Sequence, residues 1–545
     1  LRTVMARAMG YDNWDGFEPD LKRHMEKVHF HFGQLLVTDE DEETDDTLEG
    51  LTELWININD PQFKPDAVTI AGFKEPEKVL SLLRTLEAHP NTRQMTQNGL
   101  TKLARLVPLL VRKIGEQNNP EEILVKLIDL IITIERRTCY LSLLVENTGA
   151  LDTLITLAQK SPWIIHFLSG HPALLDELMQ PATLYSPPDK AALEHEMAAR
   201  MAGMASDDFE YLLEELCVFR QVNMLRVAAA DVSGNYPLMK VSDHLTYIAE
   251  TVVRQVLEIC WDIVTDRYGV PEGISGRTIE ECGFAVVAYG KVGGFEMGYK
   301  SDIDIVFLHK GGVGQTRGGR RQVDTTTFYS NLGQRVIHAL TMHTPAGSLY
   351  GADMRLRPGG SSGMIVSHIE SYEDYMEDEA WTWEHQALIR ARPIAVDIQV
   401  CEEFDRIRKK NLTRDRSDVD LKKDVSEMRE KMREQRLKPV KEAVDLKQSP
   451  GGIVDIEFLV QYLVLKHGHA FPEVTVWTDN IRLLESLNTD GVISAPESEQ
   501  LQQAYVSMRQ AIHHLNLQEK SPDESENAFS ADRKHVQALY QRYLG

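Results

Sequence analysis

The sequence predicts an α+β fold that is mostly α-helical and contains one small β region. Apolar residues recur every three or four positions along most of the 545 residues, which is the spacing of helices with one buried face. Strand signals, short runs rich in β-branched and aromatic residues beside glycines, occur at 284–290 and 302–309, with a third candidate at 349–357. Because a domain holds roughly 100 to 200 residues, a chain of this length is expected to form several units.

The composition argues against several classes of protein. A formal net charge of −24 disfavours a nucleic-acid partner, because binding a phosphate backbone requires a basic face. No apolar run approaches the ~20 residues of a membrane helix, so we expect a cytoplasmic protein with no membrane partner. The 5 cysteines have no paired spacing, which argues against a disulfide framework or a cysteine metal site. The chain starts with Leu1 and shows no secretory leader, so we expect a piece of a longer protein.

The N-terminal part of the chain is predicted to be helical. Residues 1–36 carry apolar positions at helical spacing, and the acidic run at 37–50 has too few large apolar side chains to fold, which indicates a linker. Helical spacing returns at 51–205, where prolines divide it and predict a bundle or array of short helices. These prolines are Pro120, Pro162, Pro172 and Pro181.

Two long helices are predicted to lead into the strand region. They are expected to stop near Gly234 and Gly269, because glycine commonly stands just past a helix C-terminus. Another helix is expected at 325–343, and Pro358 should stop the third strand. From Ile369 onward the apolar spacing is again mostly helical.

Two aspartates interrupt the second strand candidate. In an extended strand Asp302 and Asp304 point to the same face, with Cα atoms roughly 6 to 7 Å apart. The strand residues that point to the other face are Ile303, Ile305 and Phe307. Two carboxylates at this distance repel each other in a dry site unless a cation compensates them. Mg²⁺ prefers such oxygen ligands and is often held by carboxylates together with substrate phosphates, so the pair predicts a magnesium site.

The loop before this strand has the composition of a phosphate site. Glycines let backbone N–H groups come close to an anion, and a lysine adds a positive charge. The glycines are Gly290, Gly293, Gly294 and Gly298, and the lysine is Lys291. We therefore expect the loop and the aspartates to form the two halves of one site.

The third strand candidate adds a carboxylate and two cations. If it is extended, Asp353, Arg355 and Arg357 share one face. Three aspartates can hold two Mg²⁺ ions about 3.5 to 4 Å apart, one activating an attacking hydroxyl and the other stabilising the leaving oxygen. This arrangement indicates nucleotidyl transfer, with both arginines as phosphate ligands. Structural ion pairs are the alternative role of the arginines.

The spacing of these motifs resembles the DNA polymerase β-like nucleotidyltransferase superfamily. Four longer stretches closely resemble the bacterial glutamine synthetase adenylyltransferases: "GKVGGFEMGYKSDIDIVFLH", "MRLRPGGSSGMIVSHIESYEDY", "EAWTWEHQALIRARPIAVD" and "GGIVDIEFLVQYLVLKH". Members of that family carry an N-terminal removase domain and a C-terminal transferase domain, joined by a helical regulatory region. The stretches "EAWTWEHQALIRAR" and "MGYKSDID" resemble the transferase version.

The resemblance implies a polymerase β-like nucleotidyltransferase core, which is a small mixed sheet with helices, flanked by helical domains. The implied parts are a helical tail of a preceding removase domain at 1–36, an acidic linker at 37–50, a helical regulatory region at 51–205, a nucleotidyltransferase domain with its leading helices at 206–395 and a C-terminal helical bundle at 396–545.

The resemblance also implies the reaction. The enzyme would move AMP from ATP to a tyrosine hydroxyl of glutamine synthetase, release pyrophosphate and so regulate nitrogen assimilation. Asp302, Asp304 and Asp353 would bind two Mg²⁺ ions, and the loop from Gly290 to Ser301 would hold the ATP triphosphate. Asp353 is also a candidate to assist deprotonation of the hydroxyl. The PII signalling protein and glutamine are the implied regulators.

Several alternatives stay open. The same core could instead remove AMP by phosphorolysis, or the chain could be a catalytically silent regulatory scaffold, although three aspartates in strand register argue against the latter. A nucleic-acid polymerase or tRNA nucleotidyltransferase is disfavoured by the acidity. Lys447, Asp455 and Glu457 are candidates to reach the nucleotide, but acids also favour a helix N-terminus. Trp381 and Trp383 are expected to be packing residues rather than a platform for adenine.

Overall fold

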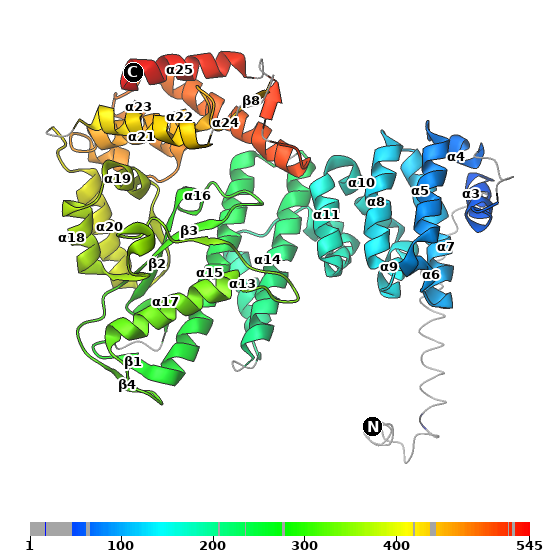
Figure 1. The fold of residues 1–545 in the computed structure, drawn as a ribbon, viewed down its shortest axis with the longest axis horizontal. Helices are drawn as coiled ribbons and strands as arrows, with labels where there is room; N and C mark the ends of the chain where they lie inside the picture. The colour runs from blue at the N-terminus through cyan, green and yellow to red at the C-terminus, as the bar shows by residue number, and fades with distance from the viewer. Residues whose placement is uncertain are drawn as a thin grey trace.

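The computed structural model confirms a mostly helical α+β protein with one mixed five-stranded sheet (Figure 1). It describes residue 17 and residues 46–60, 66–204, 208–234, 236–274, 278–417, 420–436, 443–521, 523–525 and 529–545. Most of the helical tail predicted at 1–36 and of the acidic linker predicted at 37–50 lies outside the described residues. α3 (Asp46–Ile56) begins within the acidic run.

Short helices fill the region predicted to be helical, and prolines start several of them. Pro120, Pro162, Pro172 and Pro181 are each the first residue of a helix, a position where the missing N–H costs nothing. The prediction that prolines divide this region into short helices is confirmed. The helices are α4 (Asp66–Ile70), α5 (Pro76–Ala88), α6 (Pro90–Arg93), α7 (Gln97–Gly115), α8 (Pro120–Ile134), α9 (Thr138–Glu146), α10 (Thr148–Lys160), α11 (Pro162–Gly170), the 3₁₀ helix η1 (Pro172–Met179), α12 (Pro181–Leu184) and α13 (Lys190–Met201).

The two long predicted helices are α14 (Phe209–Val232) and α15 (Leu238–Tyr268). Gly234 and Gly269 follow their ends with φ angles of 84° and 78°, in the left-handed region that glycine adopts at little steric cost. α15 contacts α13, α14, α17 (Thr325–Thr341) and a strand of the sheet. It therefore connects the N-terminal helices with the sheet.

The sheet has the strand order β5-β3-β2-β7, and β6 also pairs with β3. β2 is antiparallel to β3 and β7, whereas β5 and β6 are both parallel to β3. The strands are β2 (Phe284–Tyr289), β3 (Ile303–His309), β5 (Ala352–Asp353), β6 (Val366–His368) and β7 (Arg392–Val396). Two separate two-stranded sheets pair β1 (Gly269–Pro271) with β4 (Thr316–Gly318) and β8 (Ala443–Asp445) with β9 (Asp523–Ser525).

The third predicted strand is much shorter than the expected 349–357. β5 holds two residues and ends at Asp353. The backbone N–H of Arg355 donates to Asp353 Oδ1 at 2.9 Å, and the N–H of Arg357 donates to Met354 O at 3.2 Å. These local bonds form a turn that competes with continued strand pairing. The prediction that Arg355 and Arg357 share a strand face with Asp353 is therefore wrong.

Both faces of the sheet are buried, each in a different hydrophobic cluster. The β3 residues in the cluster shared with the N-terminal helices, α15 and α17 are Ile303, Ile305 and Phe307, as predicted for the face opposite the aspartates. Val306 and Leu308 belong to the cluster shared with the C-terminal helices. Because side chains alternate along a strand, Asp304 shares the face of Val306 and Leu308. It therefore points toward the C-terminal helices.

The C-terminal part of the chain is helical, as predicted, and covers this second face. Its helices are α18 (Ile369–Asp378), α19 (Thr382–Ile389), α20 (Ile398–Leu412), α21 (Leu421–Arg436), α22 (Ile453–His467), the 3₁₀ helix η4 (Pro472–Thr475), α23 (Asn480–Thr489), α24 (Ala495–Leu517) and α25 (Ser530–Leu544). Figure 1 shows α21 to α25 gathered beside the sheet, at the end of the molecule away from α3 to α9. Among the described residues, no helix combines the length and the apolarity that crossing a membrane requires.

Candidate active site

Asp304 and Asp353 lie side by side on one face of the sheet. β3 and β5 run parallel and pair these two residues directly, and such partners present their side chains to the same face. Asp302 stands one residue before β3 and is exposed. A Cβ on Gly351 would lie 2.3 Å from Asp302 Oδ1, so glycine at 351 leaves the space that this carboxylate fills.

The two paired carboxylates have different electrostatic environments. Burial, and next the neighbouring Asp353 carboxylate, raise the pKa of Asp304 to about 6. The pKa of Asp353 is lowered, because Arg355 Nε donates to both of its oxygens at 3.0 and 2.9 Å. The cations near Asp304, Lys291 first among them, therefore compensate its negative charge only in part.

The aspartates offer the oxygen ligands that Mg²⁺ prefers, but they do not form a complete coordination site. Across the described part of the chain, no group of three or more His, Cys, Asp or Glu side chains is close enough to hold a metal ion. Arg355 pairs with the Asp353 carboxylate. Carboxylate oxygens whose charge is only partly compensated suit Mg²⁺ chemically. That Asp302, Asp304 and Asp353 are its ligands stays a prediction. Binding would require Arg355 to release Asp353.

The predicted phosphate loop begins at Gly290, which lies next to the Asp304 carboxylate. Gly290 has a φ of 55°, and a Cβ there would lie 2.3 Å from Asp304 Oδ2, so glycine is needed for both reasons. α16 (Gly290–Gly293) follows. A Cβ on Gly293 would lie 1.9 Å from the backbone oxygen of Arg390, and a Cβ on Gly294 would lie 2.5 Å from the guanidinium of the same residue. Close approach to Arg390 thus accounts for these two glycines, and their phosphate contacts stay a prediction.

Lys291 carries the positive charge of this loop toward the aspartates. Its Nζ donates to Ser301 Oγ at 3.3 Å, and the same oxygen accepts from the Gly298 N–H at 3.0 Å. Burial lowers the pKa of Lys291, and the nearby cations Lys447 and Arg509 lower it further. Within the described residues Lys291 forms no ion pair, so its environment favours the arrival of an anion.

Arg357 is held by its own loop. Its guanidinium donates to three backbone carbonyl oxygens between residues 354 and 363, at 3.0, 3.1 and 3.2 Å. Arg355, in contrast, lines the space above Asp353. The three loop bonds leave Arg357 two of its five N–H groups for a phosphate, whereas Arg355 could offer its whole guanidinium if it exchanged Asp353 for another anion.

A cleft of about 490 Å³ opens between this corner of the sheet and the C-terminal helices, a size typical of small-ligand sites. The sheet side contributes Gly290, Lys291, Asp304, Asp353 and Arg355. The opposite side includes Lys447 before α22 and Glu457 and Gln461 on it. Trp383 also lines the cleft, whereas Trp381 is 71% exposed, so the prediction of a packing role is wrong for Trp381.

A buried ion network joins the phosphate loop to the C-terminal helices. The Arg390 guanidinium pairs with Glu296 of the loop and with Glu457 of α22, the latter at 3.1 Å. Glu296 also accepts a hydrogen bond from Asn480 Nδ2 at 3.1 Å. Sequence reasoning missed Glu296 and Arg390, because these partners lie far apart along the chain and no local spacing signals their contact.

Asp455, one of the C-terminal candidates, has a structural role. Its buried carboxylate accepts hydrogen bonds from Arg429 Nε at 2.7 Å, from Arg433 at 2.9 Å and from the Gly451 N–H at 2.7 Å. All of these donors belong to α21 and to the turn before α22. Asp455 therefore fastens α21 to the start of α22 and does not line the cleft.

Glu457 and Lys447, the other two candidates, do line the cleft. Glu457 is already paired with Arg390. Within the described part of the chain the Lys447 ammonium forms neither an ion pair nor a hydrogen bond. Lys447 therefore brings an uncompensated charge to the cleft from the C-terminal part of the chain.

Comparisons with known proteins identify relatives over the whole chain. Residues 151–407 match the family described as glutamate-ammonia ligase adenylyltransferase, and residues 420–539 match the family described as GlnD PII-uridylyltransferase. Three similar proteins are each called bifunctional glutamine synthetase adenylyltransferase/adenylyl-removing enzyme. They come from Thioalkalivibrio sulfidiphilus (41% identical, 100% of this chain and 57% of the relative), Nitrosococcus oceani (40%, 100% and 56%) and Pseudomonas putida (38%, 98% and 56%). The chain thus spans just over half the length of these relatives.

Proposed function

We propose that this chain, whose residues 151–407 match the glutamate-ammonia ligase adenylyltransferase family, transfers AMP from ATP to a tyrosine hydroxyl of glutamine synthetase and releases pyrophosphate. The direct pairing of Asp304 with Asp353 beside Lys291, in one cleft, carries the proposal. Adjacent carboxylates, and lysines that form no ion pair among the described residues, suit a metal-bound triphosphate. The names of the relatives supply the protein substrate.

In the proposed reaction the chain mainly positions the nucleotide. Lys291 and Lys447 approach the triphosphate from opposite sides of the cleft. The tyrosine oxygen forms a bond to the α-phosphorus while the bond from that phosphorus to pyrophosphate breaks, and the hydroxyl proton passes to solvent water or to the Asp353 carboxylate. Positioning and charge neutralisation supply most of the rate enhancement in such transfers.

Asp302, Asp304 and Asp353 are the residues that would hold two Mg²⁺ ions, which when bound neutralise charge on the phosphates and on the attacking oxygen. Release of Asp353 by Arg355 would then free the guanidinium for a phosphate oxygen. We further propose, from the family resemblance, that the helices within 51–205 respond to glutamine and to the PII signalling protein, which would place this cytoplasmic reaction in the control of nitrogen assimilation.

The test is to incubate the chain with glutamine synthetase, ATP and Mg²⁺ and to follow the mass of glutamine synthetase and the release of pyrophosphate. We expect the wild-type chain to add AMP, and Asp304→Asn to fold normally yet add none. Asp374→Asn, an exposed change on α18 outside this cleft, is the matched control. Full AMP transfer by Asp304→Asn would refute the assignment of the site.

Phosphorolytic removal of AMP is the second candidate, because the relatives are also called adenylyl-removing enzymes. It differs from the first candidate in its co-substrate. Adenylylated glutamine synthetase is incubated with the chain and inorganic phosphate, and ADP is measured. Formation of ADP from this mixture, with no transfer from ATP in the first assay, would favour removal over transfer.

A further inference from the structure

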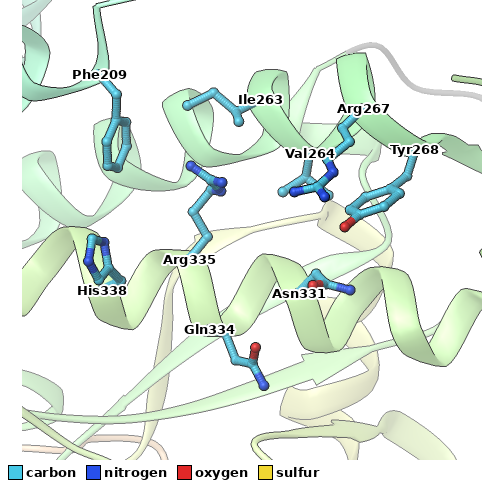
Figure 2. Close-up of a pocket in the computed structure, with 9 residues that line it drawn as sticks. All are labelled: Phe209, Ile263, Val264, Arg267, Tyr268, Asn331, Gln334, Arg335 and His338. Atoms are coloured by element: carbon cyan, nitrogen blue, oxygen red, sulfur yellow. The ribbon is translucent and has the colours of Figure 1, made fainter. Parts of the chain in front are cut away.

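A second pocket of about 490 Å³ lies between α15 and α17, on the side of the sheet away from the aspartates. Phe209, the first residue of α14, lines one end of it, and Tyr268 at the end of α15 lines the other (Figure 2). We call it the arginine pocket, after Arg267 and Arg335, which both line it. It shares no lining residue with the proposed active site.

The charge of the arginine pocket is positive. Arg267 stands in the last turn of α15 and Arg335 in the middle of α17, and Figure 2 shows both guanidinium groups directed into the space between the two helices. His338 adds an imidazole. No Asp or Glu side chain is among the described residues that line the pocket. This concentration of cationic groups contrasts with the net charge of −24 of the whole chain.

Neither arginine is neutralised by another described side chain. Within the residues that the structure describes, Arg267 and Arg335 form no ion pair. The guanidinium carbon of Arg335 lies 5.5 Å from the centre of the Phe209 ring, and that of Arg267 lies 5.1 Å from the centre of the Tyr268 ring. These rings support the guanidinium groups without removing their charge. The planar forks of both arginines therefore stay available for an oxyanion, which they can bind in bidentate fashion.

The rest of the pocket is suited to the body of an organic molecule. Ile263, Val264 and Phe209 supply apolar surface, and the volume falls within the range of small-ligand sites. We propose that the arginine pocket binds a small organic anion whose phosphate or carboxylate group lies between Arg267 and Arg335 and whose apolar body lies against these side chains.

A ligand in this position would touch a helix that supports the catalytic strands. On the opposite face of α17, a Cβ on Gly333 would lie 2.5 Å from Val366 of β6 and 3.1 Å from Phe307 of β3, so helix and sheet are in close contact. The Leu340 carbonyl of α17 accepts the Tyr350 N–H at 2.9 Å, just before β5. The ligand would bridge α15 and α17 and thereby stabilise the folded chain.

Calorimetric titration of the full chain with phenyl phosphate and with phthalate tests the proposal. The two probes share an aromatic body and differ in the anionic group, so they separate a phosphate site from a carboxylate site. Benzamide is the neutral control. We expect saturable one-site binding of at least one anion, no binding of benzamide, and a loss of affinity of roughly tenfold or more in Arg335→Gln and in Arg267→Gln. Arg320→Gln, which removes an exposed arginine paired with Asp266 outside the pocket, should leave the affinity unchanged.

Failure of both anions to saturate the wild-type chain would overturn the proposal. So would binding that persists in Arg335→Gln and Arg267→Gln but disappears in Lys291→Gln, because that pattern places the probe in the active-site cleft. If circular dichroism shows that Arg335→Gln does not fold, Arg267→Gln decides alone, since Arg267 is exposed at the end of its helix. No readout here involves AMP transfer, so the result is independent of the proposed function.

Discussion

Lys447 can receive an anionic ligand because no described side chain neutralises its charge. It lines the cleft opposite Lys291, and its ammonium has no ion pair or hydrogen bond among the described residues. Asp455, by contrast, accepts hydrogen bonds from Arg429, Arg433 and the turn before α22. Residues that look alike as candidates in the sequence therefore differ in whether they can receive a ligand.

In the proposed reaction, Lys447→Gln should raise the KM for ATP by roughly 10- to 100-fold, because a charged contact to phosphate contributes about 1.5 to 3 kcal/mol. The value of kcat should fall less, and Lys447→Arg should restore most of the affinity. Steady-state kinetics of AMP transfer measure this. Lys466→Gln, at an exposed position near the end of α22, is the control. An unchanged KM in Lys447→Gln would exclude contact with the nucleotide.

Arg390 shows the opposite case, a residue whose role is set entirely by its partners. Arg390→Leu should lower the free energy of unfolding by about 3 to 5 kcal/mol, because it leaves Glu296 buried without its cation. Urea denaturation of the chain measures the loss. Arg406→Leu removes an exposed arginine paired with Glu373 at the surface and should cost far less. Equal losses in the two variants would contradict a special role for the buried network.

At the scale of elements, α16 connects β2 to the cleft and must lie close to the chain segment around Arg390. Gly293→Ala should destabilise the protein by about 1 to 3 kcal/mol, because its Cβ would lie 1.9 Å from a backbone oxygen that cannot move aside freely. Thermal unfolding checks this. Gly149→Ala in α10 is the matched control, since apart from its chain neighbours and its own helix backbone nothing lies within 4 Å of the added Cβ. A Gly293→Ala variant as stable as Gly149→Ala would contradict the close contact.

The contact between α18 and α19 should make stability depend on pH. His385 Nε2 donates to Met376 O at 2.8 Å, and burial lowers the pKa of His385 to about 4. The unfolded chain binds a proton near pH 6.5, so the contribution of neutral His385 is complete above that pH and is lost as the pH falls toward 4, by about 1.4 kcal/mol per pH unit.

Comparing urea denaturation of the wild-type chain with that of His385→Gln between pH 7 and pH 4.5 isolates this contribution, since glutamine cannot titrate. The variant should show the shallower decline in stability. His514→Gln, at an exposed position on α24, should follow the wild type. Parallel curves for His385→Gln and the wild type would show that His385 does not titrate as proposed.

At the scale of the whole molecule, the sheet separates two hydrophobic cores and two candidate sites. The face that carries Ile305 belongs to the core that the sheet shares with the N-terminal helices, α15 and α17. The arginine pocket lies between α15 and α17. The face that carries Asp304 meets the C-terminal helices, and the cleft lies between them. The cleft therefore needs residues from both sides of that junction, since Asp304 and Lys447 belong to different parts of the chain.

Local patterns were enough to predict much of this architecture. Prolines at helix starts and glycines past helix ends act through the geometry of their own backbone, so the ends of α14 and α15 could be predicted from Gly234 and Gly269. Side-chain alternation in β3 likewise placed Asp304 opposite Ile303 and Ile305 without knowledge of any neighbour.

Contacts between residues far apart in the sequence determine the features that sequence patterns could not predict. The end of β5 at Asp353 depends on a turn stabilised by Arg355, the glycines at 293 and 294 depend on the position of Arg390, and the exposure of Lys447 depends on how α22 meets the sheet. Hydrogen bonds, burial and ion pairs of this kind arise only when separate elements come together, because periodicity along a chain carries no information about which faces meet.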